Sequence, residues 1–255
     1  MKDVEIFFFD VDGTLLNNHN HTISKATSNA LIDLKSKGYK VALCTGRNYE
    51  GIKDLGLLEL IEWDAFVLAN GSQILDSKLE LVDEILFDPS LLHRLDAQVS
   101  GPLLVEGDIN FITKEPNAKL LAAKEHFGTE ELTVKNYQDD RVYNIICYNF
   151  DEIENELLEE VQAKCQFFHD QLGNMEIIPL KSGKHNGVVR VNQLLGTSRY
   201  AAFGDGENDV EFLKHAPISV AMGNGTDNVK KVSGYITESV DQDGIIKALQ
   251  HFGVL

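Results

Sequence analysis

Cysteine is scarce in this sequence and follows no pattern. The three cysteines, Cys44, Cys147 and Cys165, are odd in number and lack the Cys-x-x-Cys spacing of thiolate metal sites. A disulfide framework and a thiolate-bound metal are therefore not expected. A reducing compartment, the cytoplasm, is the expected location.

Basic residues and long apolar runs are scarce as well. The 23 Lys and Arg residues stand against 40 Asp and Glu residues, which gives a formal net charge of −17. Nucleic-acid binding draws most of its affinity from a basic surface, so a nucleic-acid partner is not expected. No run reaches the roughly 20 apolar residues of a membrane-spanning helix. The first run stops at Asp10, so neither a signal peptide nor a membrane anchor is expected.

The remaining composition is that of a globular chain. The 255 residues are 43% hydrophobic and 25% charged, which suffices for one large domain or two smaller ones. The acidic balance would repel an anionic substrate, so such a substrate would need cations close to its binding site.

The strongest local pattern is an apolar run that stops at two carboxylates. Residues 4–9 are aromatic and β-branched with little alternation, which is typical of a strand buried on both faces in a parallel sheet. Asp10, Asp12 and Gly13 follow it, and ligands bind at the carboxyl ends of such strands. The two side chains are expected to point the same way, and two close carboxylates favour a cation such as Mg²⁺. An ordinary acidic turn is the alternative.

The next segments repeat the strand and helix pattern. A helix is predicted over residues 23–37 with Ser24 as its cap, and strands over 39–44 and 64–69. These strands end in Thr45-Gly46-Arg47 and Asn70-Gly71, which should reach the same sheet edge as the first strand. Residues 72–82 are predicted to form a hairpin that covers this edge as a flap.

The middle of the chain has a different character. Helices are predicted over residues 118–127 and 151–165, and short strands over 103–106, 142–148 and 175–179, without any acidic strand end. We therefore expect an inserted α+β domain over residues 83–182. It would interrupt a discontinuous core that consists of residues 1–82 and 183–255.

The first pattern returns after this insertion. Lys184 precedes a helix predicted over 187–195, and a strand over 200–203 ends in Gly204-Asp205-Gly206-Glu207-Asn208-Asp209. A strand over 218–222 and helices over 210–216, 226–232 and 243–252 complete a βαβ order. The outer segments should therefore form one mainly parallel sheet.

Four motifs in this order resemble those of the haloacid dehalogenase superfamily. They are Asp10-Val-Asp-Gly-Thr14, Thr45-Gly46, Lys184 and the segment Gly204 to Asp209. Three further features, Asn70-Gly71, Met222-Gly223-Asn224 and Asp243-Gly244, are similar to the Cof-type sugar-phosphate phosphatases. The resemblance implies an α/β fold: a Rossmann-like core with a mainly parallel sheet, plus an inserted α+β cap domain.

The resemblance also implies a role for each acidic residue. Asp10 would attack phosphorus to form an aspartyl-phosphate, and Asp12 would serve as general acid and base. Asp10, the main-chain carbonyl of Asp12 and Asp205 would bind Mg²⁺, while Asp209 would orient these ligands.

The phosphate-binding residues implied by the resemblance are Thr45, Gly46, Lys184 and Asn208. Each side chain has an alternative interpretation. Thr45 could cap the following helix, Lys184 could be an exposed lysine with Lys181 in its place, and Asn208 could be a turn residue.

Other polar residues are interpreted as outside the catalytic site. Arg47 is treated as exposed, and His19 and His21 as exposed loop residues, because no metal-binding spacing accompanies them. The inserted domain carries no readable substrate motif. Four of its polar residues could face either the substrate or the solvent: Glu106, Arg141, Asn144 and Glu176. Arg141 is the first to test, because a guanidinium could bind a second phosphate or a carboxylate.

The leading functional interpretation is a magnesium-dependent phosphatase that hydrolyses small phosphate monoesters, sugar phosphates above all. Its partner would be a small phosphorylated metabolite, and the protein would be a monomer or a small homo-oligomer. One alternative is a phosphotransferase or phosphomutase of the same superfamily, which passes the phosphoryl group to a sugar hydroxyl. Another is a non-catalytic phosphate-responsive regulator, against which the general acid Asp12 argues.

Overall fold

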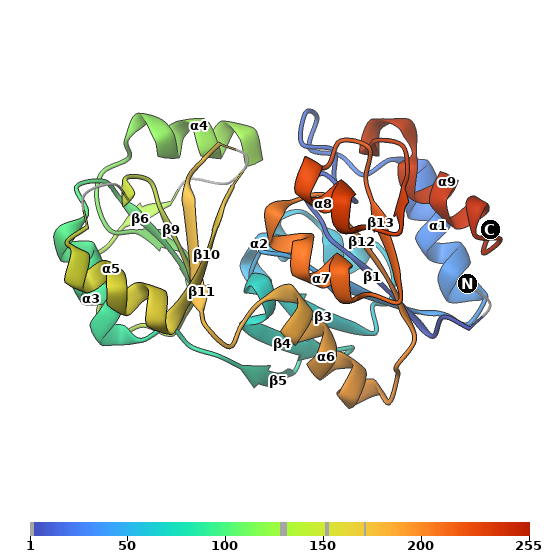
Figure 1. The fold of residues 1–255 in the computed structure, drawn as a ribbon, viewed down its shortest axis with the longest axis horizontal. Coiled ribbons are helices and arrows are strands. Elements are labelled where there is room, and N and C mark those ends of the chain that lie inside the picture. Colours follow the sequence, from blue (N-terminus) through green and yellow to red (C-terminus); the bar gives the residue numbers. More distant parts are fainter. Residues whose placement is uncertain (1–2, 128–131, 151–152, 171) are drawn as a thin grey trace.

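The computed structural model describes residues 3–127, 132–150, 153–170 and 172–255. Two β-sheets, each with its own helices, lie beside one another (Figure 1). The larger sheet has the strand order β14 (Tyr235–Ile236), β13 (Ile218–Ala221), β12 (Tyr200–Gly204), β1 (Ile6–Phe9), β2 (Lys40–Cys44), β3 (Ala65–Leu68), β4 (Gln73–Asp76) and β5 (Leu81–Glu84). The smaller sheet has the order β10 (Cys165–His169), β11 (Met175–Pro179), β9 (Val142–Cys147), β6 (Leu103–Gly107), β7 (Phe111–Ile112) and β8 (Thr133–Val134). The helices are α1 (Lys25–Ser36), α2 (Tyr49–Asp54), α3 (Pro89–Gln98), α4 (Ala118–Phe127), α5 (Asn155–Lys164), α6 (Lys184–Leu195), α7 (Val210–His215), α8 (Asp227–Val232) and α9 (Gly244–His251).

Strand β1 lies in the interior of the larger sheet, paired in parallel with β2 and β12. All four of its residues are completely buried, which confirms the prediction of a strand covered on both faces. Phe7 and Phe9 pack into the core on one face, while Ile6 and Phe8 pack into the core on the other. The strands from β14 to β3 are parallel, and β4 and β5 continue the sheet in antiparallel orientation.

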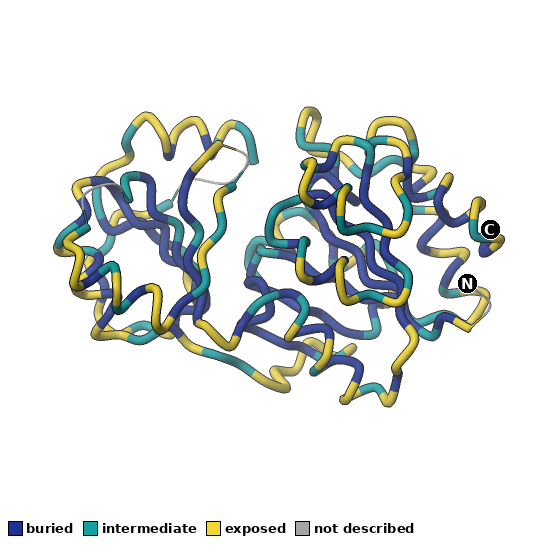
Figure 2. Tube along the Cα trace, viewed as in Figure 1, coloured by how far each residue is buried: buried dark blue, intermediate teal, exposed yellow. Residues whose placement is uncertain are grey.

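Helices cover both faces of the larger sheet (Figure 1). Helices α1 and α9 contribute apolar residues such as Leu31 and Leu249 to the face of Phe7. Helices α6 and α7 contribute Val188 and Phe212 to the opposite face. Figure 2 shows the buried strands between these partly exposed helices. The predicted cap of α1 is confirmed, because Ser24 accepts a hydrogen bond from the backbone of Thr27 at 3.0 Å.

The smaller sheet is antiparallel except for its β7–β8 pair. Helices α3 and α5 cover one face, where Val105 and Ile145 lie in a shared core. Helix α4 covers the other face near Leu104 and Ile146. Because side chains alternate along a strand, Glu106 shares the face of Leu104. Among the described residues, no helix is long and apolar enough to cross a membrane.

Several predicted elements differ from the observed ones. The hairpin of residues 72–82 forms, but it continues the larger sheet at its edge as β4 and β5, so the prediction of a flap is wrong. Strand β5 ends at Glu84. The helix predicted over 187–195 already begins at Lys184, directly after Gly183, whose φ of 108° stops the preceding segment.

Four elements of the inserted segment were not predicted, namely α3, β7, β8 and β10. Helix α3 was missed although Asp88 caps it and Pro89 occupies its first position, a recognisable start signal. The helix predicted over 151–165 ends at Lys164, and Cys165 begins strand β10 instead. The first two residues of that predicted helix, 151 and 152, lie outside the described residues.

Candidate active site

The carboxyl ends of three neighbouring strands form the candidate site. Strands β2, β1 and β12 are adjacent and parallel, with Phe9 in register with both Leu43 and Phe203. Asp10, Thr45 and Asp205 follow these strands and therefore meet at one edge of the sheet. The expectation that strand-end motifs far apart in the sequence come together is confirmed for these strands.

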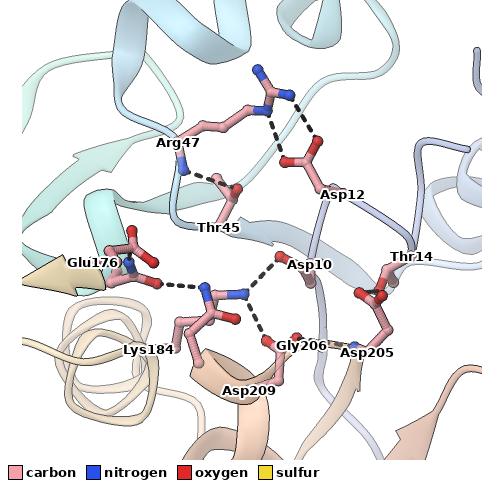
Figure 3. Close-up of polar contacts among 12 residues, drawn as sticks. Asp10, Asp12, Thr14, Thr45, Arg47, Glu176, Lys184, Asp205, Gly206 and Asp209 are labelled. Carbon is pink, nitrogen blue, oxygen red and sulfur yellow. Dashed lines mark hydrogen bonds and ion pairs between the residues drawn. The ribbon is translucent and has the colours of Figure 1, made fainter. Parts of the chain in front are cut away.

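Lys184 lies between two buried carboxylates (Figure 3). Its Nζ is 2.6 Å from Oδ1 of Asp10 and 2.6 Å from Oδ1 of Asp209. All three side chains are at least nine-tenths buried. Burial works against the charged ammonium, but the two carboxylates raise the pKa of Lys184 above its usual range. Lys181, the alternative candidate, is exposed.

Asp205 completes a cluster of three buried carboxylates with Asp10 and Asp209. One oxygen from each lies within 4.8 Å of the others. Burial raises the pKa of Asp10 to about 7 despite Lys184, and burial also raises the pKa of Asp205 well above its ordinary value. One lysine does not compensate three buried carboxylates, so the cluster calls for a further cation.

The donors and the backbone around this cluster fit a hard divalent cation. Carboxylate oxygens are the ligands that Mg²⁺ prefers. Gly13 has a φ of 79°, and a Cβ built there would lie 2.2 Å from Oδ2 of Asp205, so only glycine leaves room for this carboxylate. Both oxygens of Asp209 are engaged, Oδ1 by Lys184 and Oδ2 by the backbone N–H groups of Asp205 and Gly206 at 3.0 Å.

The Asp12 carboxylate binds Arg47, whereas the Asp10 carboxylate binds Lys184. Arg47 donates to both carboxylate oxygens of Asp12, from Nε at 2.8 Å and from Nη2 at 2.7 Å. The side chain of Arg47 is 13% exposed and also donates to the backbone carbonyl of Phe127, at the end of α4, at 2.9 Å. The interpretation of Arg47 as an exposed residue is therefore wrong. Asp10 and Asp12, which were expected to point the same way, bind different cationic side chains, Lys184 and Arg47.

The remaining motif residues surround the same edge. Thr45 is buried and accepts a hydrogen bond from the N–H of Arg47 at 3.2 Å, while Asn48 caps α2. The alternative of Thr45 as a helix cap is thus not what the structure has. Asn208 donates to Oδ1 of Asn70 at 2.9 Å. Gly46 lines the adjoining cavity, as does Asn208.

Two asparagines outside the predicted set also organise this edge. Asn224 donates to the carbonyl of Gly13 at 2.8 Å and to Oδ2 of Asp205 at 3.2 Å. Asn70 has a left-handed backbone with a φ of 50°, and it donates to Oε1 of Glu176 at 2.6 Å. Both asparagines stand in Asn-Gly or Gly-Asn turns at strand ends, a signal that the sequence carries.

A cavity lies between the two sheets and opens onto the carboxylate cluster. Its core side is polar and includes Asp10, Asp12 and Arg47. Its other side comes from the inserted segment and combines two glutamates with an apolar wall that includes Leu104, Phe127, Ile146, Tyr148 and Phe168. The site is thus enclosed by both parts of the chain.

The four polar residues of the inserted segment divide into two groups. Glu106 and Glu176 line the cavity, and Asn144 is buried between them. Burial raises the pKa of Glu106 to about 8 and that of Glu176 to about 7. Arg141 is not among the residues that line the cavity; it pairs with Glu84 and Asp108 instead. Its choice as the first substrate-binding candidate was therefore wrong.

Known proteins resemble this chain over most of its length. Residues 7–249 match the family model of haloacid dehalogenase-like hydrolases. The chain is 30% identical to the 5-amino-6-(5-phospho-D-ribitylamino)uracil phosphatase YcsE of Bacillus subtilis (strain 168), over 98% of this chain and 96% of that protein.

Solved structures share the same fold. The phosphatase BT1666 of Bacteroides thetaiotaomicron aligns with a TM-score of 0.84 and 22% identity, covering 99% of this chain and 96% of that one. The subclass IIB sugar phosphatase BT4131 aligns with a TM-score of 0.83 and 24% identity, covering 99% and 100%. The chain therefore belongs to the haloacid dehalogenase-like hydrolases, as a phosphatase of that family.

Proposed function

We propose that this protein is a magnesium-dependent phosphatase for small phosphate monoesters, sugar phosphates among them, and that it works through an aspartyl-phosphate on Asp10. The observation that carries the proposal is the 2.6 Å contact between Lys184 and Asp10 at the end of β1, with Asp205 beside them. A carboxylate can attack an anionic phosphoryl group only where cations offset their mutual repulsion.

In the first proposed step, an oxygen of Asp10 forms a bond to phosphorus while the bond from phosphorus to the ester oxygen breaks. Asp12 gives its proton to the departing oxygen, so the leaving group departs as a neutral alcohol. Lys184 and Thr45 bind the phosphoryl oxygens in this scheme, and Gly46 and Asn208 line the same end of the cavity.

In the second proposed step, Asp12 takes a proton from a water molecule that attacks phosphorus. The bond between Asp10 and phosphorus then breaks, which releases inorganic phosphate and restores the Asp10 carboxylate. The two N–H groups of Arg47 orient the ionised Asp12 carboxylate, the form that takes the proton from water in this step.

The proposed Mg²⁺ ligands are the Asp10 and Asp205 carboxylates and the main-chain carbonyl of Asp12. When bound, the cation supplies positive charge that offsets the negative charge of the phosphoryl group and the carboxylates. In this proposal Asp209 orients the metal ligands. Its hydrogen bonds with Lys184 and with the backbone N–H of Asp205 support this role.

We further propose that residues 83–182 act as the cap that selects the substrate, on a core of residues 1–82 and 183–255. The cap lines one side of the cavity and excludes water from the reaction. A cytoplasmic location is consistent with a chain that has only three cysteines, all of them buried. A monomer or small homo-oligomer is proposed as the active form.

The test is phosphate release from a panel of phosphate esters, with and without Mg²⁺. The panel contains sugar phosphates, nucleotides and phosphorylated cofactors, together with the compound for which the relative YcsE is named. Turnover should require the metal and be lost in Asp10→Asn, and Asp33→Asn, an exposed position on α1, serves as the matched control. Turnover that persists in Asp10→Asn would overturn the assignment of the nucleophile.

A further inference from the structure

Three polar residues from adjacent strands of the smaller sheet lie together on the cavity side. Glu106 of β6 and Asn144 of β9 are directly opposed in the antiparallel register. Glu176 of β11 is paired with Ile146, two residues along β9 from Asn144, and thus shares the same face. We refer to Glu106 and Glu176 as the carboxyl pair.

Asn144 holds the carboxyl pair in place. Its Nδ2 donates to Oε2 of Glu106 and to Oε1 of Glu176, both at 2.7 Å, and its side chain is completely buried. Oε1 of Glu176 also accepts from Asn70 of the core at 2.6 Å. Both carboxyl groups are therefore fixed as hydrogen-bond acceptors, and one of them is tied to the catalytic edge.

Each member of the pair keeps one oxygen for a ligand. Within the described parts of the chain, no hydrogen bond engages Oε1 of Glu106 or Oε2 of Glu176. Both residues line the cavity. Polar groups at the wall of a partly buried cavity are stabilised when a ligand supplies the missing donors, here hydroxyl or amine groups.

The charges around the pair disfavour a second anion. Among the described residues that line the cavity, seven are acidic, whereas the basic ones are Arg47, Lys124 and His169, and Arg47 is already bound to Asp12. Acidic Asp170 lies on the same wall. The side chains of Leu104, Ile146 and Phe168 in the wall beside the pair offer no donor to a phosphate or carboxylate.

We propose that the carboxyl pair determines which leaving group the enzyme accepts: one without a second anionic group, whose hydroxyl or amine groups donate to Glu106 and Glu176 and whose apolar face packs on Leu104 and Ile146. The inference rests on the proposed phosphatase function and deepens it. Glu106 and Glu176 are specificity-determining residues, and Asn144 is a positioning residue. Above pH 8, which exceeds the pKa of Glu176 (about 7) and of Glu106 (about 8), both carboxyl groups are ionised. Like charges brought together in a partly desolvated site lower affinity strongly, so the ionised pair excludes substrates by charge.

The test uses two esters, the terminal phosphates of glucitol and of gluconate, which differ only in a hydroxymethyl or a carboxylate group at the far end. Each is measured as a substrate and as an inhibitor of p-nitrophenyl phosphate turnover. At pH 9, where both carboxyl groups are ionised, the native enzyme should prefer the glucitol ester by about tenfold or more, in kcat/KM or in inhibition constant. In Glu106→Gln and Glu176→Gln this preference should shrink, and in the double variant it should fall to about one.

The control is Glu125→Gln, an exposed position on α4 that does not line the cavity, and it should keep the native preference. The single variants suffice to test the inference if the double variant does not fold. A melting curve of each variant shows whether it is folded. Equal use of both esters by the native enzyme, or an unchanged preference in both single variants, would overturn the inference. Failure of the native enzyme to hydrolyse any phosphate ester would instead overturn the proposed function.

Discussion

Arg47 donates to both carboxylate oxygens of Asp12, from Nε and from Nη2, and its Nη2 also donates to the backbone carbonyl of Phe127. The proposed general acid is therefore linked to helix α4 by one guanidinium. A planar guanidinium presents a fork of two parallel N–H donors to the two oxygens of a carboxylate, whereas the ammonium group of a lysine lacks this geometry. The orientation of Asp12 thus depends on a residue that also contacts the inserted segment.

Replacing Arg47 by Lys should lower kcat by about tenfold while changing KM less, because the charge stays and the fork is lost. Steady-state kinetics on the best ester of the panel give both constants. Lys53→Arg on α2, an exposed position, is the matched control. A rise in KM alone would show that Arg47 binds substrate without orienting Asp12.

Replacing Lys184 by Met should abolish most activity, by about a thousandfold, because the cation beside the proposed nucleophile is gone. It should also lower the free energy of unfolding by about 3 kcal/mol near neutral pH without metal, since Asp10 and Asp209 stay buried without their partner. Urea unfolding measures this change. Lys181→Met, at the exposed neighbouring lysine, should leave the free energy of unfolding unaltered; an equal loss there would contradict the assignment.

The stability of the metal-free protein should fall as pH rises from about 5 to about 8. Burial raises the pKa of Glu106 to about 8 and that of Glu176 to about 7, from an ordinary value near 4.5. Within this window the unfolded chain has lost these protons while the folded chain keeps them, so a rise in pH favours unfolding. Below the window both states are protonated, and above it both are ionised.

Unfolding by urea across this pH range tests the effect, a free energy of unfolding that decreases steadily from about pH 5 to about pH 8. The double variant Glu106→Gln with Glu176→Gln should show a flatter dependence. Profiles of equal slope in the native protein and the variant would refute the role of these two carboxyls.

Magnesium should raise the melting temperature of the native protein, because a ligand that binds only the folded state stabilises it. Asp205→Asn should remove most of this shift together with the activity, while Asp33→Asn should keep both. Differential scanning calorimetry with and without Mg²⁺ provides the measurement. A full metal-dependent shift in Asp205→Asn would place the ion elsewhere.

Local sequence determined the elements and the chemistry at their ends. An apolar run followed by Asp10 predicts a buried strand with a polar end. The buried part of a strand requires apolar side chains, whereas its carboxyl end, where ligands bind, can carry polar ones. Ser24 predicts the start of α1 because a hydroxyl can satisfy a free backbone N–H there. The βαβ order then predicts parallel neighbours, since such crossovers have one hand.

Tertiary structure alone decided which polar residues meet. Arg47 and Asp12 are 35 residues apart, and nothing local indicates that one faces the other. In the inserted segment, alternation along a strand separates Glu106 from Val105 but does not tell which face meets the core. The face that meets the core is decided by α3 and α5, which cover one face of the smaller sheet. Glu106 and Glu176 therefore face the cavity, whereas Arg141 pairs with Glu84 outside the cavity lining. Patterns along the chain thus specify burial and hydrogen-bonding capacity, whereas the partners of a charged side chain are set by the packing of distant elements.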